Sequence, residues 1–543
     1  MTEGKKNEVA VETVRIDDDS SSSEEDRRLL QLGIRRELRK EFSNFSTISF
    51  AIGIMGITAT IASTLNTPLV LGGRAVAIWS WFLGSFGCVT IAVSVAELAS
   101  AYPTAGGLYT STGFVVPLKY RSSVTFVNAW LTLLGQIAGS ASVMFALSEM
   151  IFAAVTIATD GNFTASVGQL LGVYVAVNVV FGILNSLPSR IGHRISYVYG
   201  YINVFTTLAI TIAIPIAGRK SLAPSKIVWS GIVDNSGWNN RGFAFLLGLF
   251  CVQYVMTDYD AVAHMSEEVR NAAIATPVAI VVGVVVTSVL GFFLIISACY
   301  GIRDISALPG PTGLALAQII LDNVGKDGAL VLWVCVIINI AMVCLCGQLA
   351  CIRSIYAISR DNVLPDGRIV SKVWSRTKTP IFAAILAVIL VSLLGLLALA
   401  SLIAVNAIFS VCALALDISY VIPILAKVYI SFQKDPEQRF VPGPFYTGKW
   451  SVIINIYAIV WTILETGILV MPQVFPVTAA TMNYTAPILV AVCGLSWIWY
   501  KLYWHRYYTG PASDNLLSTT ISPVPSTSDD VEQEKSSNDK ELA

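Results

Sequence analysis

The stretch FAFLLGLFCVQYVMTDYDAVAHMSEEV, residues 243–269, begins as an apolar segment suited to a lipid bilayer and then turns charged. Asp258 and Asp260 stand near mid-depth, and three more ionisable residues close the stretch. A carboxylate that faces lipid costs several kcal/mol, so these side chains must face the protein interior or water. The pattern predicts a membrane helix that is interrupted around a polar site.

The rest of the chain indicates the same environment. Of its 543 residues 55% are hydrophobic and only 13% are charged, and the mean hydropathy is +0.68. The run AILAVILVSLLGLLALASLIAV, residues 384–405, has no charge and is long enough to cross about 30 Å of hydrocarbon. Such runs do not alternate as the strands of a β-barrel would. The fold class is therefore an all-α polytopic membrane protein that lies in a lipid bilayer.

The apolar runs along the chain predict about twelve transmembrane helices. They cover 45–65, 75–99, 124–157, 167–187, 192–217, 242–264, 276–300, 328–357, 380–400, 402–430, 450–472 and 484–504. The segment PTGLALAQIILDNVG from Pro311 is amphipathic and too short to cross, so we place it at an outer surface.

The two ends of the chain are polar and rich in serine and acids, which predicts disordered tails. The predicted organisation is an N-terminal tail (1–40), a first five-helix repeat (41–217), an outer loop (218–241), a second five-helix repeat (242–431), helices eleven and twelve (432–508) and a C-terminal tail (509–543).

Lysine and arginine predict the orientation. With the N-terminus inside, the inner loops hold about twice as many basic residues as the outer loops, so both termini are expected to be cytoplasmic. The motifs NFT at Asn162 and NYT at Asn483 then fall in outer loops and are glycosylation candidates.

Two predicted helices carry interruptions at corresponding places. The first contains Gly53 and Gly56, a pair that suits either a helix break or close packing of helices. The sixth contains Gly248 and the acids quoted above, and it lies five helices later. This separation is expected for inverted repeats that each begin with a broken helix, an architecture whose substrate binds at the breaks. The pattern favours a secondary transporter.

The intramembrane acids are the other candidates for function. Asp258 could pair with a substrate ammonium or carry a coupling proton, or it could belong to an ordinary helix end. For Asp260 we expect a structural role near the inner end of the break. Glu149 and Asp417 are possible coupling or structural groups, because helices three and ten border the central pathway in such architectures.

Seven motifs in order resemble those of fungal amino-acid permeases of the amino acid/choline transporter family, within the amino acid–polyamine–organocation superfamily, with GABA permeases nearest. They are AELASAYPTAGGLY from Ala96, GNF from Gly161, DNSGWNN from Asp234, HMSEEVRNA from His264, SRDNVLP from Ser359, VPGPFYTGKW from Val441 and TMNYT from Thr481. The resemblance covers about residues 35–510.

The resemblance implies a leucine-transporter-like core of five plus five helices with two added, and proton-driven uptake of an amino acid or related amine. It implies that Gly53, Ile54, Met55 and Gly56 offer open backbone to the substrate's carboxylate. Tyr254, Thr257 and Asp258 match the second break and would face the amine. Tyr254 and Asp258 depart from the family pattern of a Trp and a small or neutral residue, which favours a more positively charged substrate.

Other functions fit less well. Formal net charge is zero, which gives no indication of nucleic-acid binding, and neither cysteines nor the three histidines have metal-ligand spacing. No cofactor motif and no GxSxG is present, so we expect no enzyme activity, no cofactor and no metal. An organic-cation permease for choline, thiamine or a polyamine, and a nutrient sensor that no longer transports, stay open as alternatives. The plasma membrane is the expected location, with the vacuolar membrane second.

Overall fold

The computed structural model describes residues 42–187, 189–400, 402–433, 440–478, 481–508 and 510–511, without the side chains of 189–197, 400 and 402–407. The tails predicted at 1–40 and 509–543 lie outside these residues, apart from Gly510 and Pro511. Across the described ranges the chain is helical and holds no strand, with an isolated bridge between Phe42 and Val269. The all-α prediction is confirmed.

Among the described residues, eleven helical segments are long and apolar enough to cross a membrane. They comprise α2 to α4 (Asn44–Met55, Ile57–Thr64, Asn66–Gly72), α5 (Arg74–Ala101), α7 (Arg121–Ala158), α8 (Val167–Asn185), α9 (Ser189–Ala217), α14 (Ala272–Gly301), α16 (Lys326–Arg360), α17 and α18 (Ile381–Gly395, Leu397–Ala400), α19 (Leu402–Ser431), α20 (Ser451–Leu469) and α21 (Thr485–Leu502). The backbone has no water partners in hydrocarbon, so these apolar runs form helices, which satisfy their own hydrogen bonds.

The predicted sixth span consists of short pieces instead of one long helix. These are α11 (Arg241–Leu247), α12 (Leu249–Val255), α13 (Ala261–His264) and the 3-10 turn η1 (Ser266–Glu268). Further short elements are α6 (Gly107–Val115), α10 (Ser225–Ser230), η2 (Ile305–Ala307), α15 (Ala315–Val324), η4 (Gly448–Trp450) and η5 (Trp504–Arg506). Helix α15 is the amphipathic segment that the sequence predicts, and its buried side includes Leu316, Ile319 and Ile320.

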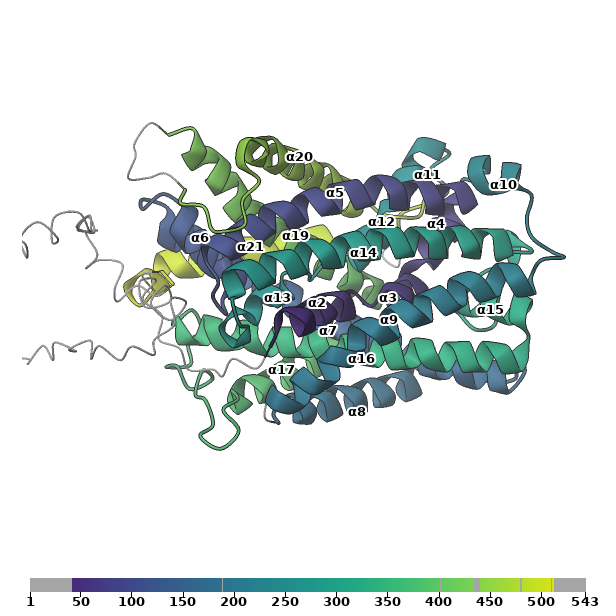
Figure 1. Ribbon diagram of the computed structural model, residues 1–543, viewed down its shortest axis with the longest axis horizontal. Coiled ribbons are helices and arrows are strands. Elements are labelled where there is room, and N and C mark those ends of the chain that lie inside the picture. The colour runs from purple at the N-terminus through teal and green to yellow at the C-terminus, as the bar shows by residue number, and fades with distance from the viewer. Residues whose placement is uncertain are drawn as a thin grey trace, which may run out of the picture. The chain divides into compact units, whose positions relative to one another are not determined.

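The two broken helices lie inside the bundle. Helices α2 and α3 contact α9, α14 and α16, and α12 contacts α3, α5 and α19. Figure 1 shows that the chain passes from α2 to α3 toward the end where α10 lies, whereas it passes from α12 to α13 in the opposite direction. The two broken helices are therefore antiparallel, which is the relation expected between the first helices of inverted repeats.

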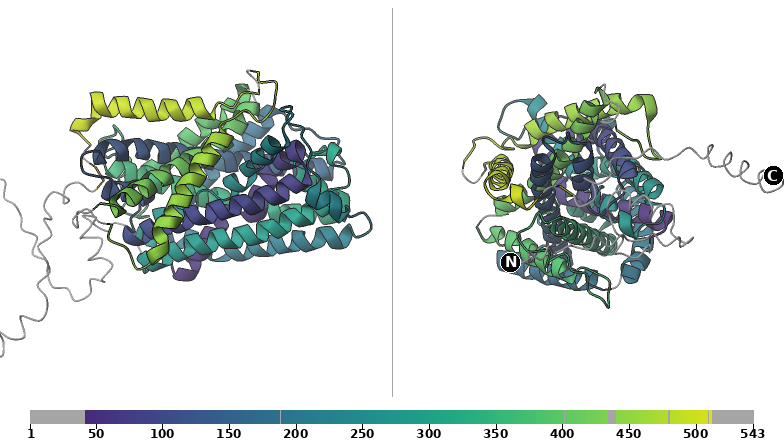
Figure 2. Two further views of the ribbon diagram at one scale, coloured as in Figure 1. Left: turned by 90° about the horizontal axis from the view of Figure 1, so that it is seen from above. Right: turned by 90° about the vertical axis from the view of Figure 1, so that its left-hand side faces the viewer.

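The long helices run side by side, as the end-on view in Figure 2 shows, and α21 lies at the periphery of the bundle. Small residues allow the inner helices to approach closely. A Cβ atom on Gly84 of α5 would lie 2.1 Å from Val252, and one on Gly291 of α14 would lie 2.2 Å from Trp81. Glycines that leave room for a side chain of the neighbouring helix in this way favour close helix association in membranes.

Candidate functional site

The first break lies between α2 and α3, at Gly56. Gly56 has a φ of +53°, a left-handed conformation that glycine adopts readily. The Met55 carbonyl accepts from Thr60 Oγ1 at 2.6 Å, and the Ile52 carbonyl accepts both from the Gly56 N–H at 3.3 Å and from Asn203 Nδ2 at 2.7 Å. The Ala59 N–H donates to the Gly56 carbonyl at 2.8 Å, whereas the first two N–H groups of α3, those of Ile57 and Thr58, have no backbone acceptor among the described residues and lie at the positive end of the helix dipole. This end of α3 therefore suits an anionic group.

The second break follows α12 and covers residues 256–260. Asp258 has a φ of +60°, which is uncommon for a residue other than glycine, although aspartate is enriched there. Helical bonding resumes where the Ala261 N–H donates to the Asp258 carbonyl at 3.1 Å. The sequence around Asp258 thus forms an open turn in the bundle interior.

A small cavity lies between the two breaks. It offers about 30 Å³ to the centres of water-sized molecules, which is enough for water but not for an amino acid. It is lined by Ile54, Met55, Thr60, Gly139, Ser142, Val143, Tyr254, Val255, Thr257, Asp258, Val343, Gly347 and Cys412. A substrate could enter only if the helices around the cavity move apart.

Asp258 is the acid that lines this cavity. Gln136 Nε2 of α7 donates to its Oδ1 at 2.6 Å, and its Oδ2 lies about 4.0 Å from the position that a Cβ on Gly347 would take. No lysine or arginine is among the lining residues. The hydroxyl of Thr257 is buried and has no hydrogen-bond partner within the part of the chain that the structure describes. Asp258 Oδ2 and the Thr257 hydroxyl can therefore accept hydrogen bonds from the N–H groups of a substrate.

Of the residues predicted for the site, five line the cavity: Ile54, Met55, Tyr254, Thr257 and Asp258. The two predicted glycines do not. A Cβ on Gly53 would meet Tyr199 at 3.0 Å, and one on Gly56 would meet Val343 at 2.1 Å. Gly53 therefore serves close packing against α9, the second reading that the sequence allowed, while Gly56 forms the break itself.

Sequence reasoning missed the partners that α7 and α16 contribute. Gln136 holds Asp258, and the Ser142 hydroxyl accepts from Tyr254 OH at 2.8 Å. Gly347 leaves space beside Asp258. A polar Gln136 within an apolar helix was a visible signal, but nothing in the sequence indicates which acid it faces.

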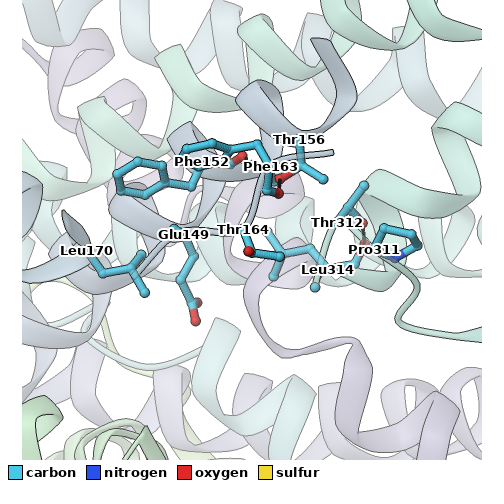
Figure 3. A pocket seen from close by; sticks show the side chains of 12 residues that line it. Glu149, Phe152, Thr156, Phe163, Thr164, Leu170, Pro311, Thr312 and Leu314 are labelled. Atoms are coloured by element: carbon cyan, nitrogen blue, oxygen red, sulfur yellow. Dashed lines mark hydrogen bonds between the residues drawn. The ribbon is translucent and has the colours of Figure 1, made fainter. Parts of the chain in front are cut away.

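Glu149 does not reach the central cavity. It lines two adjoining cavities of about 230 and 300 Å³, which also share Leu170, Gly313 and Leu314, and together we call them the vestibule. Figure 3 shows Glu149 between Leu170 and Thr164. Phe409 lines the vestibule, and its ring centroid lies 5.0 Å from that of Tyr254, which lines the central cavity. Aromatic rings thus separate the two spaces.

Asp260 lies beyond the break in a buried polar network. Tyr420 OH of α19 donates to its Oδ1, and His264 Nε2 lies 3.3 Å from its Oδ2. His264 Nδ1 in turn lies 2.9 Å from the Ala105 carbonyl. These contacts agree with the structural role that we expect for Asp260, which stays a prediction. Asp417 also lies away from the cavity, and its Oδ2 accepts from Gln253 Nε2 at 2.8 Å.

The glycosylation candidates differ in their surroundings. Asn162 is exposed. Asn483 is half-buried, and its Nδ2 donates to the carbonyls of Leu469 at 2.7 Å and Met471 at 3.3 Å, so a glycan, which replaces one of the two N–H hydrogens, would remove one of these bonds. Both assignments stay predictions, with Asn162 the better placed.

Within the described ranges no three His, Cys, Asp or Glu side chains gather as a metal site.

Comparison with known proteins places this geometry in a family. The model of the family described as amino acid permease matches residues 42–493, which include both breaks. The chain belongs to the amino acid permease family. An uncharacterized amino-acid permease of Schizosaccharomyces pombe is 38% identical over 90% of the chain and 89% of that protein. Amino-acid permease 2 of Neurospora crassa is 32% identical over 92% and 91%, and the GABA-specific permease of Saccharomyces cerevisiae is 31% identical over 90% and 85%. The resemblance found from motifs is confirmed, and these relatives are transporters.

Proposed function

We propose that this permease imports an amino acid or a related amine such as GABA by proton symport, in the plasma membrane or, second, in the vacuolar membrane. The observation that carries the proposal is the cavity between two antiparallel broken helices, lined by one carboxylate and no cation. Family membership supports an amino-acid-type substrate, and the similarity to the GABA-specific permease of Saccharomyces cerevisiae makes GABA a candidate.

The two breaks offer complementary charges to a zwitterion. The N-terminus of α3 favours the carboxylate of an amino acid through its free N–H groups and the helix dipole. Asp258 across the cavity favours the ammonium, with the free hydroxyl of Thr257 as a further acceptor. A zwitterionic amino acid, with its carboxylate at α3 and its ammonium at Asp258, would then bind without changing the net charge of the site.

Alternating access requires the cavity to open in turn to each side. We propose that a bundle formed by the first two helices of each repeat, 45–65, 75–99, 242–264 and 276–300, rocks against the remaining helices around the breaks. With both termini cytoplasmic, the vestibule beside Glu149 would be the outer approach. Separation of Phe409 from Tyr254 would then join the vestibule to the central cavity.

An organic cation is the second candidate for the substrate. Asp258 supplies a negative charge that a choline or polyamine head group could use, and the ring of Tyr254 offers a cation–π face. Such a substrate would not need the free N–H groups of α3. The two candidates therefore differ in whether the substrate must carry a carboxylate.

The test is uptake by the purified full-length protein in proteoliposomes. Labelled GABA, neutral and basic amino acids, choline and spermidine are offered with and without an inward proton gradient. We expect accumulation of an amine that carries a carboxylate, increased by the gradient. Accumulation of choline or spermidine alone would favour the organic-cation function, and binding with neither uptake nor counterflow would indicate a sensor.

A further inference from the structure

A pair of buried acids lies behind the second break and takes no part in the central cavity. Asp417 on α19 and Glu465 on α20 are both fully buried, and their carboxyl groups lie within hydrogen-bonding reach of each other. Neither forms an ion pair in the part of the chain that the structure describes. Oδ1 of Asp417 lacks an N–H or O–H donor there, and the indole N–H of Trp461 lies toward Glu465 without forming a full hydrogen bond.

Two ionised carboxylates in contact can only accept hydrogen bonds and repel each other. A proton on one of them removes the repulsion and supplies the missing donor. The amide of Gln253 indicates which acid stays charged, since its Nε2 donates to Asp417 at 2.8 Å while its Oε1 accepts from Cys88 Sγ at 3.4 Å. The donor on Asp417 favours its carboxylate form, which leaves the proton on Glu465.

Among the described residues, the titratable groups that interact electrostatically with this pair include no cation. They are Cys88 of α5, Tyr259 and Asp260 of the second break, and Cys412 of α19. The nearby His264 is turned to Asp260 and the Ala105 carbonyl. Trp461 on α20 packs against Gly87 of α5, where an added Cβ would lie 2.0 Å from the indole. A proton is thus the cation that this site can hold.

The pair is also connected to both sides of the second break. Gln253 lies on α12, before the break, and binds Asp417. Tyr420 lies three residues after Asp417 on α19 and donates to Asp260, beyond the break. Helix α19 therefore contacts both ends of the segment that carries Asp258. A change of charge at the pair would act on the segment through Gln253.

We propose that Asp417 and Glu465 share the coupling proton of this transporter. The inference deepens the proposed function and rests on it. The pair accepts a proton from the outer side, which stabilises the contact of α12 with α19 through Gln253. Loss of that proton to the inner side leaves two repelling carboxylates, which loosen α12 and the segment around Asp258. Substrate binding and proton binding are thereby linked.

The test compares Glu465→Gln and Asp417→Asn with the wild type in proteoliposomes. Glutamine mimics the protonated acid, so we expect Glu465→Gln to keep counterflow within about threefold. Accumulation driven by a proton gradient should fall at least tenfold, as should proton influx that accompanies the substrate. Asp417→Asn should have the same effects on counterflow, accumulation and proton influx, because either change removes the pair of acids. Asp160→Asn, an exposed aspartate that pairs with Lys326, is the matched control.

Infrared spectroscopy of the purified protein gives a readout that does not need transport. The wild type should show the C=O stretch of a protonated carboxyl at neutral pH, and Glu465→Gln should remove it. Gradient-driven accumulation at the wild-type level in both variants, or an unchanged infrared band, would overturn the inference. A wild type that transports but ignores the proton gradient would instead overturn proton symport itself, so the two failures can be told apart.

Discussion

At the scale of single residues, Asp258 supplies the negative charge that lines the central cavity. A left-handed conformation in a non-glycine residue costs on the order of 1–3 kcal/mol, so the surroundings must hold it there. Gln136 does so at one carboxylate oxygen, and the absence of a side chain at Gly347 leaves the other oxygen accessible. The strained turn points its carboxylate toward the space where we place the substrate amine.

Replacing Asp258 with asparagine should weaken binding of the substrate ammonium. A hydrogen bond to a charged group contributes about 1.5–3 kcal/mol, which corresponds to a rise in KM of about 10- to 150-fold. Uptake kinetics in proteoliposomes measure the change, with Asp160→Asn as the matched control on an exposed aspartate. A KM equal to that of the wild type would exclude Asp258 from substrate binding.

Gly56 gives a second prediction at this scale. An alanine there would need a left-handed backbone and would place its Cβ 2.1 Å from Val343, so Gly56→Ala should destabilise the protein by about 2–4 kcal/mol. Gly467 of α20 has open space around it, so Gly467→Ala should leave stability equal or slightly higher. Thermal unfolding in detergent compares the two. Equal unfolding temperatures would mean that α2 and α3 do not need a break at Gly56.

At the scale of elements, the end of the second broken helix is held by buried ion pairs in addition to the apolar packing of Val262 and Met265. Arg353 Nε of α16 lies 2.7 Å from Glu268 Oε1, and both side chains are buried. Arg360 Nη1 lies 3.3 Å from Glu267 Oε1, which also accepts from the Ala105 N–H at 3.0 Å. These pairs fix α13 and η1 to α16 while residues 256–260 stay non-helical.

Removing one partner of the buried pair should be costly. Glu268→Gln leaves the Arg353 charge without a counter-ion and should destabilise the protein by about 3–5 kcal/mol. The double variant with Arg353→Met should recover part of this loss, because it buries no unpaired charge. Thermal unfolding of the single and double variants forms the cycle. A single variant as stable as the wild type would show that the pair does not anchor η1.

At the scale of the whole molecule, the sequence predicts the helices better than it predicts which side chains of different helices contact each other. The uncharged run at 384–405 could only be membrane helix, and each predicted span has its counterpart in the structure. The glycine pair suggests a break near Gly56, yet only the structure separates the packing of Gly53 from the turn at Gly56. Contacts such as Gln136 with Asp258, 122 residues apart, depend on how helices pack and leave no local pattern.

Orientation is a further prediction at this scale. The excess of lysine and arginine in alternate loops predicts cytoplasmic termini and an outer vestibule beside Glu149. Protease treatment of intact cells should therefore leave tags at both termini uncut and should cut a site inserted near the exposed Asn162. Cleavage of the terminal tags from outside would reverse the orientation and make the vestibule an inner opening.

The central claim is that a small nitrogenous substrate binds between two helices broken at corresponding depth. Cryo-electron microscopy of the full-length protein with the transported amine tests it most directly. We predict that α2–α3 and α12–α13 stay unwound at Gly56 and at 256–260, with the substrate ammonium within hydrogen-bonding distance of Asp258. Continuous helices at these positions, or substrate density away from both breaks, would contradict the account.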